Sequence, residues 1–422
     1  MRLSTLLCVL ALLLSLHATN AQTTADKTYA LRNGQWFDGK AFKAKTFYVV
    51  NGLLAERAPK QIDETVDLKN GFVIPPFGDA HCHHFDGAYG LDELIKTYLN
   101  EGIFYAKVPG NSPDGARAAS IKLNRPDSVD ILYANGAFTG SYSHPMGTYE
   151  PLALGVPWNQ WREQADRIAK SRLAEGGAYY TLDNADDLEK KWPRILSTKP
   201  GFIKIILTDS ENYERDKEKV GVDVRRGLPP ALVPLVVKRA HAAGLRVAAH
   251  VDIAADFHLA LTAGVDEMAH MPGYGLREEE DARKYELSEA DVKLAAKRKV
   301  AVTATANRAE FDPPSPKRKA TQLRNLRLLK KHGVSVLIGT DSYGTSASRE
   351  AFYLNQLGLY SSLELLKQWC ETTPQNIFPQ RKLGRLQEGY EASLLVLSAN
   401  PLEQFAHIKQ IQMRFKQGMR LR

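Results

Sequence analysis

The chain has 422 residues, of which 44% are hydrophobic and 25% are charged, and its formal net charge is +8. This composition is typical of a globular protein and excludes a disordered, collagen-like or multi-span membrane protein. Its basic residues are interspersed with acidic ones, without aromatic–basic alternation or zinc-finger spacing, so we expect no nucleic-acid partner.

The first 21 residues differ from the rest of the chain. Arg2 precedes an apolar run from Leu6 to Leu16, and small residues follow it up to Ala21. The run is shorter than the roughly 20 apolar residues of a membrane-spanning helix and is typical of a cleaved secretory signal peptide. We therefore expect residues 1–21 to be removed and the mature protein to be exported without a stable membrane span. It would be periplasmic if the source is bacterial and secreted otherwise.

Both ends of the mature chain have the alternating pattern of β-strands. Residues 29–56 contain three turn signals, Asn33-Gly34, Asp38-Gly39 and Asn51-Gly52. Residues 392–397 and 408–421 also read as strands. Neither end has enough apolar residues for a core of its own, so we predict one small β-sandwich domain assembled from residues 22–70 and 382–422.

Between these ends, one unit repeats: a helical pattern, a residue that stops the helix, and a short apolar run. In four of the five clearest units the residue that stops the helix is glycine. In the fifth unit the helix begins after Ser288 and ends at Lys299 without a glycine. The eight predicted strands are residues 71–80, 103–105, 130–138, 201–207, 245–249, 265–269, 300–303 and 334–338. Eight β–α units predict an α/β fold, a TIM (β/α)8 barrel over residues 71–381, with an insertion at about 141–185 over its mouth.

His81 and His83 stand two residues apart at the end of the first predicted barrel strand. Residues i and i+2 of a strand point to the same face, so the two imidazoles converge at the carboxyl end of that strand. Such a pair is well placed to bind a metal ion. The alternative is a pair of polar loop histidines.

Other predicted strands also end in residues of metal-ligand type, namely His250, His270 and Asp341. A single histidine after a strand is usually a loop residue, but four histidines and an aspartate at strand ends favour a metal site. Three other histidines fall inside helical patterns and are interpreted as structural: His241, His258 and His332.

Lys204 interrupts the apolar run of residues 202–206, where an unpaired ammonium group would be costly to bury. A neutral buried lysine can react with carbon dioxide to form a carbamate, whose two oxygens can bridge two cations. The alternative is an ion pair with Asp209 or Glu211.

Together these residues resemble the metal-dependent amidohydrolase superfamily, and within it the imidazolonepropionase-like branch that includes prolidase-like metallo-dipeptidases. The motifs that carry the resemblance are Pro75–His83, Ile203-Lys204-Ile205, Ala240–His250, Gly264–His270 and Gly339–Ser342. Pro76, Gly78 and Ser393 depart from the usual family residues, and none of them is a metal ligand.

The resemblance implies a site with two divalent metal ions. His81, His83 and Asp341 would bind the first ion, His250 and His270 the second, and a carbamylated Lys204 and a hydroxide would bridge both. Zinc is the default ion, although manganese, cobalt or nickel also suits such ligands. Asp341 would carry a proton from the hydroxide to the leaving amine. His144 either contacts the substrate carbonyl, as a histidine in the corresponding region of relatives does, or is a loop histidine.

We therefore expect a metal-dependent amidohydrolase that cleaves a carbon–nitrogen bond, in an amide, a cyclic amide or a dipeptide, through a metal-bridging hydroxide. Two alternatives stay open: a lactone, ester or phosphotriester hydrolase that uses the same site, and a non-catalytic binding paralogue. The expected partner is a small-molecule or dipeptide substrate. The sequence leaves open the substrate's identity and whether the protein is a homo-oligomer.

Overall fold

The computed structural model describes residues 27–221, 224–310 and 315–422. The expected signal peptide at residues 1–21 lies outside this part of the chain. Among the described residues, no helix is both long enough and apolar enough to cross a membrane.

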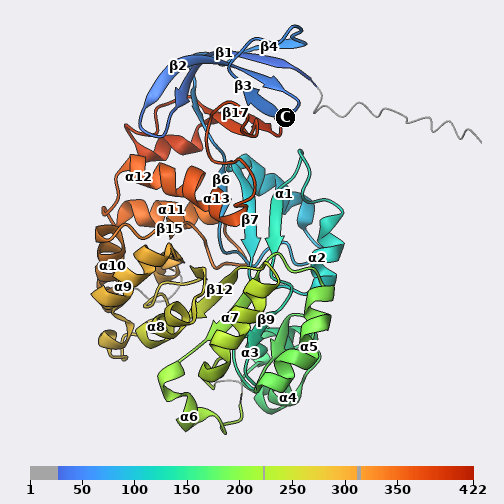
Figure 1. Ribbon diagram of the computed structural model, residues 1–422, viewed down its shortest axis with the longest axis vertical. Helices are drawn as coiled ribbons and strands as arrows, with labels where there is room; N and C mark the ends of the chain where they lie inside the picture. The colour runs from blue at the N-terminus through green and yellow to red at the C-terminus, as the bar shows by residue number, and fades with distance from the viewer. Residues whose placement is uncertain (1–26, 222–223, 311–314) are drawn as a thin grey trace, which may run out of the picture.

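Strands from both ends of the chain form one eight-stranded sheet, at the top of Figure 1. From the N-terminal side come β1 (Tyr29–Phe37), β2 (Phe42–Val50), β3 (Leu53–Ala55), β4 (Glu64–Asp67) and β5 (Phe72–Ile74). From the C-terminal side come β16 (Leu394–Leu397), β17 (Ile411–Lys416) and β18 (Met419–Leu421). The two groups meet where β16 pairs antiparallel with β5.

Asn33-Gly34 lies inside β1 and not in a turn, so this part of the sequence prediction is wrong. The pairing of β1 with β2 shifts its register between Leu31 and Gly34, and Asn33 has a φ of 57°. Asparagine tolerates this left-handed conformation, and the dipeptide forms a bulge within one long strand. A Cβ atom at Gly34 would lie 2.7 Å from Cδ1 of Leu68, so a larger residue here would have to displace that side chain.

The remaining strands are parallel and form two sheets. One contains β6 (Phe77–Asp79), β7 (Ile103–Val108) and β8 (Asp130–Tyr133). The other contains β9 (Ala137–Thr139), β10 (Tyr179–Thr181), β11 (Ile203–Leu207), β12 (Val247–Val251), β13 (Glu267–Met268), β14 (Ala301–Thr303) and β15 (Val336–Leu337). Its strand order is β10-β9-β11-β12-β13-β14-β15. The molecule is therefore an α/β protein with parallel strands.

Two of the eight predicted strands are divided in the structure. Residues 71–80 form β5 and β6, because Pro75 and Pro76 between them lack the N–H groups that a sheet needs. Residues 130–138 divide into β8 and β9 at Asn135 and Gly136, which both have positive φ angles. As a result β5 belongs to the sheet of the chain ends, although its residues were assigned to the barrel.

Backbone hydrogen bonds connect the two parallel sheets on both sides. On one side the chain runs from β8 into β9, and the Gly201 N–H donates to the Tyr133 carbonyl at 2.8 Å. On the other side, the Ala80 N–H donates to the Ile338 carbonyl at 2.8 Å. The end of β6 therefore lies next to the residues that follow β15.

Helices connect these strands (Figure 1). They are α1 (Leu91–Asn100), α2 (Pro113–Ser120), α5 (Ala185–Ser197), α6 (Tyr213–Asp216), α7 (Val233–Ala242), α8 (Ala254–Ala263), α9 (Glu289–Arg298), α10 (Pro316–Lys331), α11 (Ala347–Gln356), α12 (Ser362–Lys367) and α13 (Thr373–Ile377). The predicted insertion contains α3 (Met146–Ala153), the 3-10 helix η2 (Trp158–Gln160), α4 (Ala165–Lys170) and β10.

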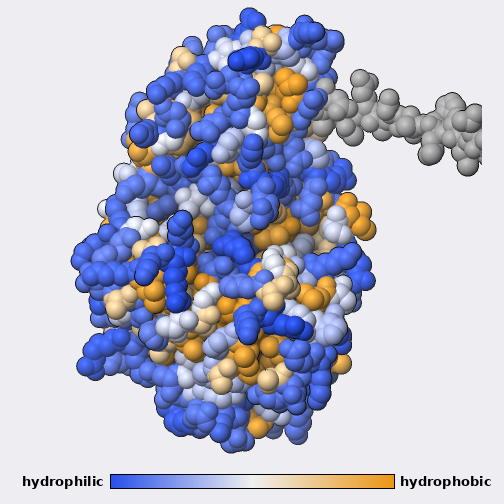
Figure 2. Space-filling view, viewed as in Figure 1, coloured by the Kyte–Doolittle hydropathy of each residue, from blue (hydrophilic) through white to orange (hydrophobic). Residues whose placement is uncertain are grey.

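The predicted helix ends are confirmed. The four capping glycines have positive φ angles, at Gly102, Gly244, Gly264 and Gly333. Lys299 adopts the same left-handed conformation after α9, with a φ of 57°, and the Ser288 side chain caps the start of that helix. The surface in Figure 2 is mainly hydrophilic, with an apolar patch over the region where Figure 1 labels α3 and α7.

A buried ion pair connects the sheet of the chain ends to the parallel strands. Lys416 of β17 has a fully buried side chain, and its Nζ lies 2.6 Å from Oδ1 of Asp130 in β8. The same Nζ donates to the carbonyls of Arg125 and Ser128. Arg381 also donates to Asp130, at 2.7 Å.

Replacing Lys416 with methionine should therefore lower the free energy of unfolding by about 3 kcal/mol, at the lower end of the cost of breaking a buried pair, because Arg381 still pairs with Asp130. Urea denaturation measures this change. The control is Lys43→Met, which removes a pair with Asp38 whose lysine side chain is 64% exposed and should cost at most about 1 kcal/mol. Equal losses in both variants would contradict the anchoring role of Lys416.

Candidate metal centre and active site

The carboxyl ends of the parallel strands surround a cavity of about 640 Å³. It is lined by His144 and by all six predicted metal ligands, His81, His83, Lys204, His250, His270 and Asp341. These side chains come from β11 and β12 and from the segments that follow β6, β9, β13 and β15. The parallel strands therefore bring together residues that lie far apart in the sequence.

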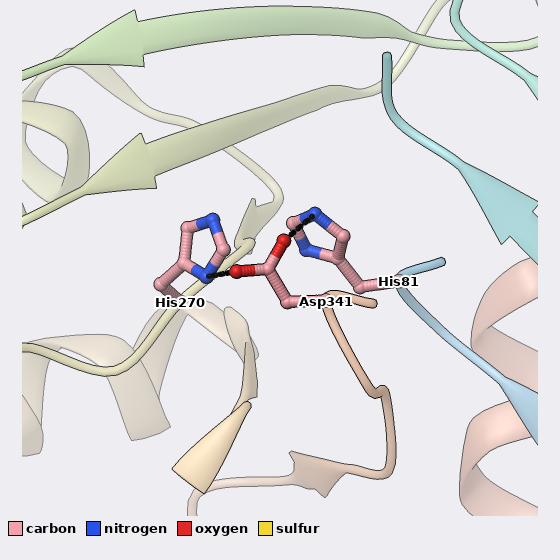
Figure 3. A group of neighbouring side chains, drawn as sticks. All are labelled: His81, His270 and Asp341. Atoms are coloured by element: carbon pink, nitrogen blue, oxygen red, sulfur yellow. Dashed lines mark ion pairs between the residues drawn. The ribbon is translucent and has the colours of Figure 1, made fainter. Parts of the chain in front are cut away.

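Asp341 lies between two imidazoles at the centre of this group (Figure 3). Its Oδ1 is 3.4 Å from Nε2 of His81, and its Oδ2 is 3.9 Å from Nδ1 of His270. One ligand atom from each of the three residues lies within 4.8 Å of the others. Because nitrogen and carboxylate ligands converge here in a buried place, these residues could hold a divalent metal ion.

His83 and His250 extend this cluster on two sides. Nε2 of His83 lies 3.0 Å from Oδ1 of Asp341, so both histidines of the His81–His83 pair reach the same carboxylate. The ring of His250 lies 4.5 Å from that of His270, between centroids. However, Nε2 of His250 faces Asp252, with Oδ1 at 3.0 Å.

Lys204 is buried in β11, and its Nζ has no hydrogen-bond partner among the described residues. The alternative ion pair is not observed: Asp209 instead pairs with Arg215, and Glu211 pairs with Lys284. Burial lowers the pKa of Lys204 to about 7, so a substantial share of the amine is neutral at physiological pH. A buried neutral amine that lines the cavity has the reactivity that carbamate formation needs.

Burial also determines the charge of the other ligands. It lowers the pKa of His81 and of His270 well below the ordinary value, so both imidazoles are neutral. Burial would raise the pKa of Asp341, but interactions with the surrounding histidines, among them the hydrogen bond from His83, hold it well below the ordinary value. The cluster therefore offers neutral nitrogen and anionic oxygen, the donor forms that bind zinc and similar ions. The donor set and the unpartnered Nζ of Lys204 fit a metal centre.

Hydrogen bonds behind the cluster orient its rings. Nδ1 of His81 lies 2.9 Å from the carbonyl oxygen of Ala269, which can only accept, so Nδ1 carries the proton and Nε2 is free. Nδ1 of His270 lies 3.0 Å from Oγ1 of Thr305.

The backbone at Asp341 is held in an unusual conformation. Its φ is 53°, in the left-handed region that residues other than glycine rarely adopt, and its N–H donates to the His81 carbonyl at 2.8 Å. A Cβ atom at Gly339 would lie 2.8 Å from the backbone nitrogen of His81, so only glycine allows this approach. Such conformations cost about 1–3 kcal/mol and cluster at functional sites.

Several residues of the cavity wall were not predicted, and three of them contact the histidine cluster. Asp252 follows His250 by two residues, the same spacing that identified His83, and could have been found by that rule. Tyr274 donates to Asp252 at 3.0 Å and stacks on His270 with 4.3 Å between ring centroids. Arg308 places Nη1 3.3 Å from Oδ2 of Asp341. No sequence pattern indicates Tyr274 or Arg308.

The four other histidines discussed in the sequence analysis fall into two groups. His144 is exposed within the cavity, with its ring 5.0 Å from that of His250, and its contact with a substrate stays a prediction. The three histidines interpreted as structural do not line this cavity and pair with carboxylates elsewhere: His241 with Asp266, His258 with Asp291 and His332 with Glu289.

Comparison with known proteins gives a match to a protein family. Residues 187–420, more than half of the chain, match the family model described as the Amidohydrolase family. A segment of 75 residues is 37% identical to ochratoxinase of Aspergillus niger, and it spans 17% of this chain and only 16% of the ochratoxinase.

Solved structures share the fold over nearly the whole chain. The crystal structure of A. niger ochratoxinase superposes with a TM-score of 0.70 at 17% identity, covering 93% of this chain and 95% of that one. A Xaa-Pro dipeptidase superposes with a TM-score of 0.68 at 14% identity, covering 93% and 99%. A molinate hydrolase superposes with a TM-score of 0.69 at 15% identity, covering 94% and 95%.

We predict that the purified protein binds about two divalent ions per chain, because the six predicted ligands would suffice for a two-metal site. His270→Ala should reduce the bound metal, measured by inductively coupled plasma mass spectrometry after dialysis. The matched control is His258→Ala, which changes an exposed histidine in α8 and should keep the wild-type content. Unchanged metal content in His270→Ala would contradict the assignment.

Proposed function

This chain belongs to the amidohydrolase family, and we propose that it is a metal-dependent hydrolase that cleaves a carbon–nitrogen bond in a small molecule or dipeptide. The family match confirms the resemblance inferred from the motifs. The observation that carries the proposal is that all six predicted ligands line one cavity. Further support comes from structural neighbours that are named as hydrolases.

We also propose that the parallel strands close into a barrel. The eight strands of this barrel would be β6, β7, the combined strand β8–β9, β11, β12, β13, β14 and β15. The hydrogen bonds from Ala80 to Ile338 and from Gly201 to Tyr133 support this closure, because each connects the two parallel sheets. In this arrangement β10 belongs to the insertion.

The proposed centre holds two divalent ions, with zinc as the default. His81, His83 and Asp341 would hold one ion, His250 and His270 the other, and the carbamate of Lys204 would be shared. When bound, the two ions would acidify a water molecule and polarise the scissile carbonyl.

Asp341 would move the proton that this reaction requires. Its pKa is held low by the surrounding histidines, among them the hydrogen bond from His83, so the carboxylate is ionised and can accept a proton from the attacking water. The proton then passes to the leaving nitrogen, because an amide anion is too basic to leave unprotonated. Overall, water supplies a hydroxyl group to the carbonyl carbon and a hydrogen to the nitrogen as the C–N bond breaks. His144, exposed in the same cavity, would donate a hydrogen bond to the carbonyl oxygen.

The test of the function is hydrolysis of dipeptides, N-acyl amino acids and lactones by the metal-loaded protein. With the best amide substrate, Asp341→Asn should lose about 10²–10⁴-fold in turnover, because asparagine retains a coordinating oxygen but cannot accept the proton. Asp38→Asn, in the turn after β1, is the control and should keep the wild-type turnover. A variant with both metals and more than about a tenth of the turnover would rule out the proton-carrying role. If the protein hydrolyses only lactones, the lactone-hydrolase alternative replaces the amide assignment.

Lys204→Ala should lose two-metal binding, because alanine cannot form the bridging carbamate. Short carboxylic acids should restore part of the metal binding and the rate, since they supply the two missing oxygens. In the wild-type protein, carbon-13 NMR after incubation with labelled bicarbonate should show a carbamate signal that Lys204→Ala lacks. Lys190→Ala, an exposed lysine of α5, is the control. Normal metal content and rate in Lys204→Ala would show that Lys204 is only structural.

A further inference from the structure

The walls of the cavity carry two chemically different groups of side chains. Trp158 and Trp161 come from the insertion and line the large cavity. Arg225, Arg277 and Arg308 line it too, and they also line a second cavity of about 560 Å³ that neither tryptophan touches. The three arginines therefore lie where the two cavities meet, away from the wall that Trp158 and Trp161 form (the tryptophan wall).

The tryptophan wall has one anchored ring and one available ring. The indole N–H of Trp161 donates to the Val156 carbonyl at 3.0 Å, which fixes the ring. Trp158 packs against it, with 4.2 Å between ring centroids, yet remains 78% exposed. A large exposed aromatic surface beside a reaction cavity favours binding of a planar apolar group, because stacking removes both surfaces from water.

Two of the three arginines are paired with carboxylates, and one is not; Glu278 and Glu279 also line the second cavity. Arg225 pairs with Glu280, at 2.6 Å, and Arg308 contacts Asp341. Arg277 is exposed, and within the described ranges its guanidinium has neither a hydrogen-bond nor an ion-pair partner. A guanidinium without a partner in a cavity favours an anionic ligand, which it can bind through two parallel hydrogen bonds.

The carboxylates of the large cavity do not pair with Arg277. Its two lining carboxylates are Asp252 and Asp341. Asp252 already accepts from Tyr274 and lies against His250, and Asp341 lies within the histidine cluster. Bound divalent ions would add further positive charge, so the cavity as a whole attracts an anion.

We propose that the substrate is an amide with a planar aromatic group on one side, which stacks on Trp158, and an anionic group on the other, which Arg277 binds. This inference rests on the proposed function, because it names the substrate class of the same cavity. The scissile bond would lie between the two groups, near Asp341, where Arg308 borders the cluster. Trp158 and Arg277 are then specificity-determining residues contributed by the insertion and by the segment between β13 and α9.

Three amides distinguish the contribution of Trp158 from that of Arg277. 2-Naphthoyl-leucine carries both groups, N-isopentyl-2-naphthamide lacks only the carboxylate, and acetyl-leucine lacks only the aromatic ring. Arg277→Gln should lower kcat/KM about 10- to 100-fold for the two carboxylates and leave the neutral naphthamide unchanged, as expected for a hydrogen bond to a charged group. Trp158→Ala should lower kcat/KM about 10-fold for the two naphthoyl compounds and leave acetyl-leucine unchanged.

The matched controls are Arg283→Gln and Tyr89→Ala. Both side chains are strongly exposed and line neither cavity. Both variants should retain the wild-type preferences, and thermal unfolding midpoints show whether each variant is folded. An equal loss on charged and neutral amides in Arg277→Gln, or on naphthoyl and acetyl compounds in Trp158→Ala, would overturn the proposal.

Binding of a compound that cannot be hydrolysed separates this inference from the proposed function. N-(2-naphthylmethyl)-leucine has an amine in place of the amide, and titration calorimetry should show weaker binding to Arg277→Gln and to Trp158→Ala than to the wild-type protein. If no amide is cleaved but both variants bind more weakly, the proposed function fails and the specificity assignment stands. If amides are cleaved without either preference, the assignment fails and the function stands. Absence of both cleavage and binding would overturn both.

Discussion

Backbone hydrogen bonds between the end of β6 and the segment after β15 hold the candidate active site together. The N–H of Ala80 donates to Ile338, that of Asp341 to His81, and that of His83 to Ser342. These bonds place the His81–His83 pair against Asp341, although the two segments come from distant parts of the chain. The approach is so close that residue 339 must be glycine, and Asp341 adopts a left-handed backbone conformation beside it.

Burial then sets the chemistry of the residues that this contact brings together. Removal from water makes His81 and His270 neutral and lowers the pKa of Lys204 to about 7, while the imidazoles keep Asp341 ionised. These are the protonation states in which each group can coordinate a metal. The same burial destabilises the fold when no ligand is bound, because the Lys204 Nζ then has no hydrogen-bond partner in the described part of the chain.

The ligands and the cavity walls make separate contributions to function. The proposed metal ligands lie in or directly after the parallel strands, whose positions the sheets fix. The walls come from connecting segments: the insertion supplies Trp158 and Trp161, and the segments after β13 and β14 supply Arg277 and Arg308. The distant structural neighbours share the fold at 14–17% identity, so they do not indicate what these walls recognise.

The sequence by itself determined the features that depend on local patterns. The alternation of strands and helices, the glycine caps and the ligand-type residues at strand ends were all readable, because each depends on neighbours within a few positions. Only the tertiary structure decided the features that depend on distant contacts. These include the division of residues 71–80 between two sheets, the orientation of His250 towards Asp252, and the positions of Tyr274 and Arg308. No local pattern encodes them, because each depends on which loop packs against which strand end after the chain has folded.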